Sequence, residues 1–481
     1  MVASTIPWET VQQTFRRIWG YDDFRPPQAE IIRGLLDQRD TLVILPTGGG
    51  KSLCFQLPAL LQSGVTLVLS PLVALMENQV QELREHQLPA ATLHSELSPH
   101  QRRQVLRALE ANRLRLLYLS PETLLSPPVW QRLRQPSVII NGLILDEAHC
   151  LVQWGDSFRP VYRRLGAVRP ALLAQRPPGT RLPIAAFTAT ADPTVQRTLI
   201  EVLRLQQPHQ VRLNPYRSNL HLATRIVWSP RQRRQTMQRF IQQRSGQAGL
   251  VYVRSRQDSE DLAAWLMIQG QTAAAYHAGL SSGDRRRIEM AWSQNQVQTV
   301  VCTSAFGMGV NKPDTRWVLH YQAPSSLTEY VQEVGRAGRD GRPAEALTLM
   351  SEPTGWLDPM DQQRWRFFTT QTQALRREAQ HIARQIPAVG SVAQVQQQFK
   401  QGAIALAWLH GQGRLTWSDP FHYRLLPGSN STATLGSVVS AMQDYLSSRR
   451  CRWQHLLEQF GFGHEARQLG TCGHCDRCQR S

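Results

Sequence analysis

The sequence predicts an α/β protein with two tandem parallel-sheet domains, followed by a mostly helical C-terminal region that carries a cluster of cysteines. From about Thr41 to Met350, short apolar runs alternate with amphipathic helical stretches, a pattern typical of parallel sheets covered by helices. The runs form two sets with a boundary near Gln206–Pro215. A chain of 481 residues is also too long for one ordinary core.

Each predicted strand is a brief run that favours β-structure and is followed by turn or helix-capping residues. The strands of the first set are Thr41–Leu45, Thr66–Leu69, Arg115–Leu119, Gly142–Leu145 and Ile184–Thr188. Those of the second set are Gly249–Val253, Ala273–Tyr276, Thr299–Thr303, Trp317–Tyr321 and Ala346–Met350. We therefore place the first domain at residues 1–208 and the second at residues 209–352.

The pattern changes after Glu352. Helices are predicted over Gln362–Gln385, Ser391–Phe399, Gln401–His410 and Leu435–Phe460, and a hairpin over Arg414–Trp417 and His422–Leu426. Two short helices followed by a hairpin are the outline of a winged helix. We expect a helical segment over residues 353–434 with this winged-helix insert at about residues 386–427, and a cysteine-bearing module over residues 435–481.

The composition indicates a globular protein with a polyanionic partner. A hydrophobic fraction of 41% is enough for globular folding, and a net charge of +18 favours nucleic acid as the partner. The sequence shows no signal peptide and no apolar run of membrane-spanning length. We expect a soluble, cytoplasmic protein.

The segment Leu45-Pro46-Thr47-Gly48-Gly49-Gly50-Lys51-Ser52 follows a predicted strand and opens a helix. This is the setting of a phosphate-binding loop, in which glycines let backbone N–H groups surround phosphate oxygens. We expect Lys51 to reach the β- and γ-phosphates of ATP and Ser52 to hold Mg²⁺. An ordinary glycine-rich turn is the alternative, but it does not explain the Gly-Lys-Ser ending.

An acidic pair, Asp146 and Glu147, ends the predicted strand Gly142–Leu145. Ligands sit at this end of the strands in parallel sheets. We expect Asp146 to bind Mg²⁺ through water and Glu147 to activate the attacking water. A turn with two solvated acids is the alternative, and the spacing after the phosphate loop argues against it.

Two further groups are candidates for nucleotide contacts. Upstream of the phosphate loop are Tyr21, Arg25 and Gln28; Gln28 has the paired donor and acceptor that the edge of adenine requires, and Tyr21 suits stacking on the base. The second domain supplies Gln332, Arg336 and Arg339. We expect the two arginines to lie at a helix start and to reach the γ-phosphate when the domains close, as an arginine finger in cis; a basic surface turn is the alternative.

Aromatic and basic residues follow the acidic pair closely, and they are Trp154, Phe158, Arg159 and Tyr162. Stacking and cation–π contacts with splayed bases need this mixture. A buried aromatic cluster is the alternative, but the interleaved Gly155 and Pro160 favour a loop. Thr188 and Thr190 close the next strand, and we expect them to bind DNA and to relay the nucleotide state to the nucleic-acid face.

Four cysteines, Cys451, Cys472, Cys475 and Cys478, have a spacing that suits a closed tetrahedral Zn²⁺ site. Four thiolates leave no open position for water, so such a zinc would be structural. An iron–sulfur cluster is a weaker alternative, and His474 is a possible replacement for one cysteine.

The order of these motifs resembles that of the RecQ family of superfamily-2 DNA helicases. The matching segments are Phe24–Gln28, Pro46–Ser52, Asp146–Cys150, Thr188–Thr190, His277–Leu280, Ala305–Gly309, Asn311–Asp314 and Gln332–Asp340. They cover roughly the first 350 residues, and the cysteine cluster extends the resemblance. The aromatic-rich loop and the cysteine after Asp-Glu-Ala-His separate the chain from RNA helicases of the same superfamily.

The resemblance implies two RecA-like domains and an ATP-hydrolysing helicase that moves 3′ to 5′ on single-stranded DNA and unwinds duplex DNA in recombination and repair. It also implies ATP, Mg²⁺ and Zn²⁺ as ligands, single-strand-binding and recombination proteins as partners, and a nucleoid-associated location. The chain is expected to be a short form that ends after the zinc-binding module. The alternatives are a DNA-stimulated translocase without strand separation, and a zinc- and winged-helix-based DNA-binding protein with a vestigial ATPase.

One departure from the family pattern lies in the aromatic-rich loop. The family usually has His-Asp after Trp-Gly, and this chain has Asp156-Ser157. The strength of the coupling between strand binding and hydrolysis depends on this loop.

Overall fold

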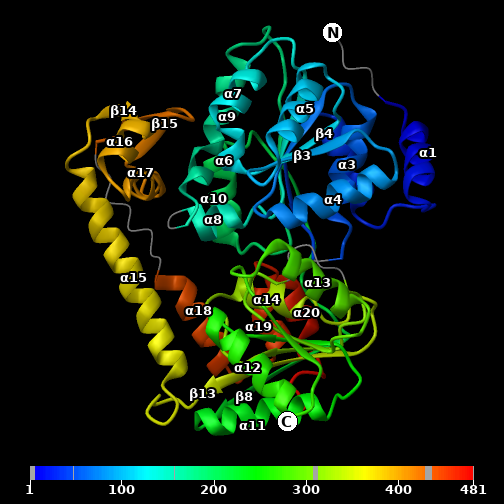
Figure 1. Ribbon diagram of the computed structural model, residues 1–481, viewed down its shortest axis with the longest axis vertical. Helices are drawn as coiled ribbons and strands as arrows, with labels where there is room; N and C mark the ends of the chain where they lie inside the picture. Colours follow the sequence, from blue (N-terminus) through cyan, green and yellow to red (C-terminus); the bar gives the residue numbers. More distant parts are fainter. Residues whose placement is uncertain (1–5, 47, 156–157, 307–311, 428–435, 480–481) are drawn as a thin grey trace. The chain divides into compact units, whose positions relative to one another are not determined.

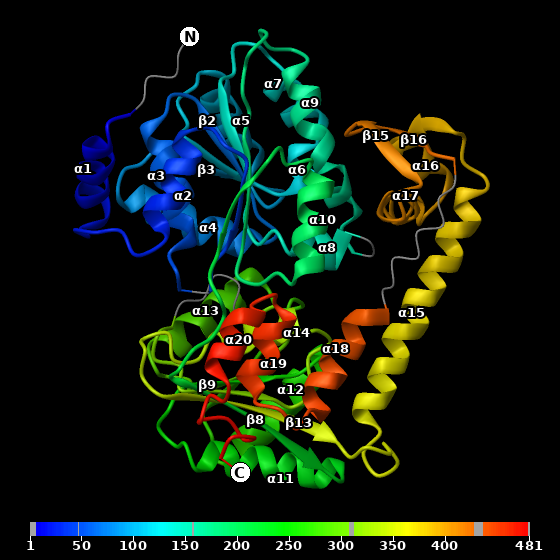
Figure 2. The ribbon, with the colours of Figure 1, turned by 180° about the vertical axis from the view of Figure 1, so that it is seen from behind.

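The computed structural model describes residues 6–46, 48–155, 158–306, 312–427 and 436–479, and it divides into two compact units. The first unit joins Met1–Leu213 to Thr372–Ala433, and the second joins Asn214–Gln371 to Thr434–Ser481. Each unit contains its own large sheet with helices around it (Figures 1 and 2). These sheets confirm the predicted fold class.

The first unit is built on a parallel sheet with the strand order β3-β4-β2-β5-β6-β1-β7. Its strands are β1 (Thr41–Ile44), β2 (Val65–Leu69), β3 (Ala90–Leu93), β4 (Leu116–Leu119), β5 (Ile140–Leu145), β6 (Ile184–Thr188) and β7 (His209–Arg212). β6 pairs in parallel with both β1 and β5, so the carboxyl ends of these strands meet at one edge. β7 pairs with β1, so the first sheet extends beyond the boundary predicted at residue 208.

Helices cover the two faces of this sheet, where separate apolar clusters form the core. They are α1 (Trp8–Trp19), α2 (Gln28–Leu36), α3 (Lys51–Leu61), α4 (Val73–Glu85), α5 (Pro99–Glu110), α6 (Pro121–Leu124), α7 (Pro127–Leu133), α8 (Cys150–Gly155), α9 (Val168–Leu173), α10 (Pro193–Leu203) and the 3₁₀ helix η1 (Pro160–Ala167). Local sequence determines where some of these helices begin. Ser98 and Gln101 form a capping box at the N-terminus of α5, and Asp192 caps the N-terminus of α10.

The second unit contains a parallel sheet with the strand order β10-β11-β9-β12-β13-β8. Its strands are β8 (Leu220–Val227), β9 (Gly249–Tyr252), β10 (Ala273–Tyr276), β11 (Thr299–Cys302), β12 (Trp317–His320) and β13 (Ala344–Ser351). Its helices are α11 (Pro230–Gln242), α12 (Arg256–Ile268), α13 (Ser282–Ser293) and α14 (Leu327–Val334). Serine side chains cap all four helices at their N-termini.

The long helix α15 (Met360–Ala383) leads to an insert at residues 386–427 that belongs to the first unit. The insert contains β14 (Val389–Ser391), α16 (Val392–Gln398), α17 (Gly402–Gly411), β15 (Leu415–Asp419) and β16 (His422–Leu425). Its helix–helix–hairpin order matches the prediction, and β14 adds a third antiparallel strand beside β16. This arrangement fits the outline of a winged helix.

The cysteine-bearing end of the chain belongs to the second unit and contains α18 (Gly436–Ser447), α19 (Arg452–Gln459) and α20 (Gly463–Leu469). The single helix predicted over Leu435–Phe460 is wrong, because α18 ends at Ser447 and Cys451, which precedes α19, has a non-helical backbone with a ψ of 130°. This break turns the Cys451 thiol toward the other cysteines. Within the described residues, no helix is both long and apolar enough to cross a membrane.

Candidate functional site

The phosphate loop lies between β1 and α3, at the carboxyl edge of the first sheet. Gly50 has a φ of 72°, and a Cβ there would lie 2.3 Å from Gln28 Nε2, so the position requires glycine. Gln28 donates from Nε2 to the Gly49 carbonyl at 3.2 Å and accepts from the Arg25 amide at 3.0 Å. The predicted adenine-reading segment is therefore connected directly to the phosphate loop.

The acidic pair follows β5 at the same edge of the sheet. Asp146 is buried, accepts from Gln79 Nε2 at 3.4 Å and from the Glu147 amide at 3.0 Å. Burial raises the pKa of Asp146 to about 6; the Glu147 carboxylate adds to the rise and Lys51 opposes it. Lys51 Nζ lies 3.7 Å from Glu147 Oε1. The structure thus brings Lys51 and both acids together, with a buried carboxylate that a divalent cation would stabilise in its ionised form.

A short polar chain leads from the acidic pair to the end of β6. Glu147 Oε2 lies 3.3 Å from His149 Nδ1, which lies 3.0 Å from Thr188 Oγ1. Thr188 donates in turn to the Thr190 carbonyl at 3.0 Å. Burial lowers the pKa of His149 to about 4, so its ring is neutral near pH 7. Thr188 and Thr190 are both buried, which argues against the predicted direct contact with DNA, and the relay stays a prediction.

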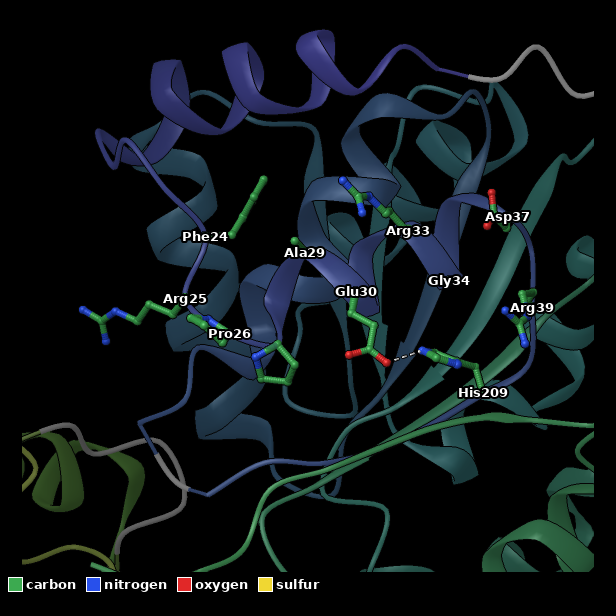
Figure 3. A pocket seen from close by; sticks show the side chains of 11 residues that line it. Phe24, Arg25, Pro26, Ala29, Glu30, Arg33, Gly34, Asp37, Arg39 and His209 are labelled. Carbon is green, nitrogen blue, oxygen red and sulfur yellow. Dashed lines mark ion pairs between the residues drawn. The ribbon is translucent and has the colours of Figure 1, made fainter.

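The segment upstream of the loop forms a partly exposed aromatic surface. Tyr21 is 55% exposed, and its ring lies 6.0 Å from that of Phe15, which stacks on Phe24 at 4.3 Å. A cavity of about 480 Å³ adjoins Phe24 and Arg25, and Figure 3 shows its lining, including the ion pair between Glu30 and His209 at 3.0 Å. The lining does not include the phosphate loop, so this cavity is separate from the phosphate site.

The arginines of the second unit follow the end of α14. Because α14 ends at Val334, Arg336 and Arg339 lie in the turn after a helix, and the predicted helix start is wrong. Gly338, with a φ of 60°, supports this turn, since a left-handed backbone does not continue a helix. Gln332 lies inside α14 as predicted.

A buried ion pair anchors α14. Arg254 donates from Nη1 and Nη2 to the two carboxylate oxygens of Glu333 at 2.8 Å each, and His320 Nε2 lies 3.1 Å from the same carboxylate. Burial opposes ionisation of Glu333, but Arg254 and His320 outweigh it and lower the pKa to about 2. This bidentate pair fixes the helix that leads into the arginine turn.

The described part of the aromatic-rich loop, residues 154–155 and 158–162, contains three side chains that suit contacts with bases. The Trp154 and Phe158 rings meet edge to face at 5.8 Å, and the Arg159 guanidinium lies 5.8 and 5.9 Å from them. Phe158 is 69% exposed, and Arg159 donates to the Pro71 carbonyl at 2.6 Å. Tyr162 is only 1% exposed within the core, so its predicted contact with nucleic acid is corrected to a packing role.

The four predicted cysteines form one cluster in which all Sγ atoms lie within 4.8 Å of one another. The Cys472–Cys478 and Cys475–Cys478 sulfur distances are 3.8 and 3.5 Å, close to the ~3.8 Å expected between thiolates around tetrahedral zinc. The amides of Cys472 and Arg452 point at Cys451 Sγ and Cys475 Sγ at 3.3 and 3.4 Å. Sulfurs that accept amide hydrogen bonds at this spacing fit a structural zinc site. His474 instead contacts Tyr216.

Some predicted residues lie outside the described residues: Thr47, Asp156, Ser157, Gly309 and Asn311. Other residues at the site were missed in the sequence. Gln79, Arg254 and His320 carry no local signal, because each meets its partner only through the fold. Asp476 was also missed, although its place inside the cysteine motif is a signal that could have indicated a structural role.

Comparisons with known proteins agree with this geometry. The DEAD/DEAH box helicase family matches residues 25–198, and the helicase conserved C-terminal domain family matches residues 232–341. Among solved structures, a DNA-bound structure of the DUF1998 helicase MrfA covers 89% of this chain and 64% of its own, with a TM-score of 0.60 and 20% identity. Dbp5 of S. cerevisiae bound to RNA covers 74% and 90%, with a TM-score of 0.57 and 14% identity. At these identities, the structures support the fold alone.

Curated relatives give a closer match. An ATP-dependent DNA helicase RecQ from Synechocystis is 54% identical over 473 residues, which are 98% of each chain. The probable ATP-dependent DNA helicase RecS of Bacillus subtilis is 40% identical and covers 70% of this chain and 66% of its own. RecQ of Haemophilus influenzae is 38% identical over 74% of this chain and 56% of its own. With its nucleotide-site residues and cysteine cluster in place, the chain belongs to the RecQ family of ATP-dependent DNA helicases.

Proposed function

We propose that this helicase moves 3′ to 5′ on single-stranded DNA and unwinds duplex DNA during recombination and repair. The observation that supports coupling most directly is the polar chain from Glu147 through His149 to Thr188. It begins at the acidic pair and lies next to α8, which carries Trp154 into the aromatic-rich loop. A change in the nucleotide site therefore has a short covalent and hydrogen-bonded route to the proposed DNA contacts.

In the proposed hydrolysis step, Glu147 accepts a proton from water as the water oxygen attacks the γ-phosphorus. The bond to the bridging oxygen breaks, and ADP and phosphate are released. Lys51 neutralises phosphate charge, and the amides of Gly48, Gly49 and Gly50 surround the phosphates with Thr47. Mg²⁺, held by Ser52 and Asp146, would supply charge for the phosphate oxygens.

Two further groups of residues would act on the nucleotide. We assign adenine recognition to Tyr21, Arg25 and Gln28, on the basis of the bond between Gln28 and the phosphate loop. We assign stabilisation of the γ-phosphate to Gln332, Arg336 and Arg339, since the buried pair of Arg254 and Glu333 anchors the helix before them. We assign ATP binding to the first domain, whose sheet extends to β7 (His209–Arg212), and the γ-phosphate contacts to the second domain.

DNA contacts are assigned to Trp154, Phe158 and Arg159, whose mixture of rings and charge suits splayed bases. Zinc would be held by the four clustered cysteines, where it would cross-link α19 to the C-terminal loop. Single-strand-binding and recombination proteins are the proposed partners, and the nucleoid is the proposed location.

The test combines ATP hydrolysis, with and without single-stranded DNA, with strand separation of duplexes that carry either a 3′ or a 5′ tail. We expect DNA to stimulate hydrolysis and only the 3′-tailed duplex to be unwound. Unwinding of the 5′-tailed duplex alone would contradict the polarity. Stimulated hydrolysis without unwinding of either duplex would indicate a translocase that does not separate strands.

A further inference from the structure

The insert at residues 386–427 is docked on the first unit, although the helices on either side of it lead into the second. Figures 1 and 2 show the insert, coloured orange, beside α6 and α8 in both views. Its own apolar cluster includes Ala167, the last residue of η1. Because η1 directly continues the aromatic-rich loop, the insert contacts the segment that holds the loop in place.

Two arginines of the first unit bind the hairpin of the insert. Arg164, in η1, donates from Nη1 to the Pro420 carbonyl at 3.2 Å. Arg204 donates from Nη2 to the Trp417 carbonyl at 3.1 Å. Burial lowers the pKa of Arg164 to about 10, which leaves the guanidinium charged at pH 7. Charge-assisted bonds to carbonyl groups therefore add to the apolar contact.

An aromatic contact completes the interface. The Phe421 ring, from the turn between β15 and β16, meets Trp130 of α7 edge to face with ring centroids 5.4 Å apart. Phe421 packs on the core of the first sheet and is absent from the cluster that forms the interior of the insert. Its side chain thus serves the docking of the insert, and the fold of the insert depends on other residues.

The opposite side of η1 is packed against the aromatic-rich loop. α8, η1 and α17 form successive contacts, so η1 lies between the other two. Buried Arg163 lies over Gly155, where a Cβ would be 3.5 Å from Arg163 Cγ. On the insert, burial together with the charges of Arg163 and Arg204 lowers the pKa of His410 to about 3, so a neutral ring faces these arginines. Packing is therefore continuous from α17 to α8.

We propose that the insert positions the aromatic-rich loop for single-stranded DNA, and that Phe421 and Arg204 are positioning residues for it. A 3₁₀ helix such as η1 has poorer hydrogen-bond geometry than an α-helix, so its shape depends on packing from both sides. With the insert in place, η1 holds Arg159 and the rings of Trp154 and Phe158 in the arrangement that contacts bases. This inference rests on the proposed role of the loop in DNA binding.

The test uses one variant on each side of the interface, Phe421→Ala on the insert and Arg204→Ala on the core. Gln397→Ala, at an exposed position of α16, is the matched control. Hydrogen–deuterium exchange over residues 150–167, measured without DNA, should be faster in both variants than in the control. DNA-stimulated hydrolysis should fall about threefold to tenfold, mainly through weaker apparent affinity for single-stranded DNA, with DNA-independent hydrolysis unchanged.

The outcomes separate this inference from the proposed function. If Trp154→Ala leaves DNA stimulation unchanged, the role of the loop in DNA binding is wrong. If Trp154→Ala abolishes stimulation while both interface variants exchange and hydrolyse like the control, the positioning role is overturned. The positioning role would also be overturned if Phe421→Ala changed exchange or stimulation and Arg204→Ala changed neither. The insert would then act through contacts of its own with DNA.

Discussion

The change Arg452→Met should release the cysteine module from the second sheet. The Arg452 side chain is fully buried and donates from Nε and Nη2 to the Asp476 carboxylate at 2.9 and 3.2 Å. Asp476 lies between Cys475 and Cys478 and also accepts from the Thr224 amide of β8 at 3.2 Å. Burial opposes ionisation of Asp476, but Arg452 outweighs it and lowers the pKa, so the carboxylate is charged at pH 7. Methionine fills a similar volume without replacing the charge.

The expected magnitude follows from the buried carboxylate that remains. Removing one partner of a buried ion pair costs about 3–5 kcal/mol, because the other charge stays desolvated. This corresponds to roughly two to three and a half orders of magnitude in the equilibrium between the docked and released module. Replacing both partners, in Arg452→Met with Asp476→Leu, should cost much less, since no unpaired charge remains.

Release of the zinc proposed for the four cysteines to a chelator, followed with a chromogenic indicator, measures this effect, and thermal unfolding gives a second reading. The control is Arg450→Met, because Arg450 pairs with Glu458 where both side chains are substantially exposed. Such a pair is worth about 0–1 kcal/mol, so the control should release zinc at nearly the rate of the unmodified protein. The reasoning is refuted if Arg452→Met behaves like this control, or if the double variant loses zinc as readily as the single one.

Three further predictions concern the first unit. Lys51→Ala should reduce hydrolysis to background while DNA binding, measured by fluorescence anisotropy, stays largely intact; persistent turnover would show that the nucleotide site is misassigned. Trp154→Ala should remove most of the DNA stimulation and leave DNA-independent hydrolysis unchanged in the same assay. Because the pKa of Asp146 is raised to about 6, its proton should compete below that pH with the Mg²⁺ that we propose this carboxylate binds. The Mg²⁺ concentration for half-maximal hydrolysis should therefore rise about tenfold per pH unit below pH 6 and stay level above it.

The sequence predicted most of the strands that are short, continuous and apolar, because such runs have a strong local signal. β3 was missed although Ala90–Leu93 is buried throughout. β6 was predicted with its observed limits, Ile184–Thr188. β7 was missed since His209–Arg212 is mostly polar at the edge of the sheet. β8 was missed since its second half exposes Arg225 and Ile226, which breaks the apolar pattern. The missed strands β3, β7 and β8 all lie at the edges of their sheets, whereas the edge strand β10 was predicted with its observed limits, Ala273–Tyr276.

The candidate site likewise contains residues that the sequence could predict and residues that it could not. Residues that lie next to each other in a motif, such as Asp146 and Glu147, were predicted because one strand end places both of them. Burial was harder to predict, and Tyr162 shows why. Its neighbours in the sequence indicate a loop, but η1 turns its ring into the core of the first sheet. Only the fold decides which aromatic side chains of such a loop face solvent.

The docking of the insert shows the limit of local sequence most clearly. The helices and hairpin of the insert were predicted, whereas the bond from Arg164 to Pro420 joins residues 256 positions apart and has no local signal. Chain order alone would assign the insert to the C-terminal region, as a separate module that could be deleted. The contacts assign it to the first unit, so a deletion would expose Ala167 and Trp130 and remove one side of the support of η1. Loss of DNA stimulation in such a deletion would therefore not by itself show that the insert binds DNA. The substitutions Phe421→Ala and Arg204→Ala answer that question, because they weaken the docking of the insert without removing the insert from the chain.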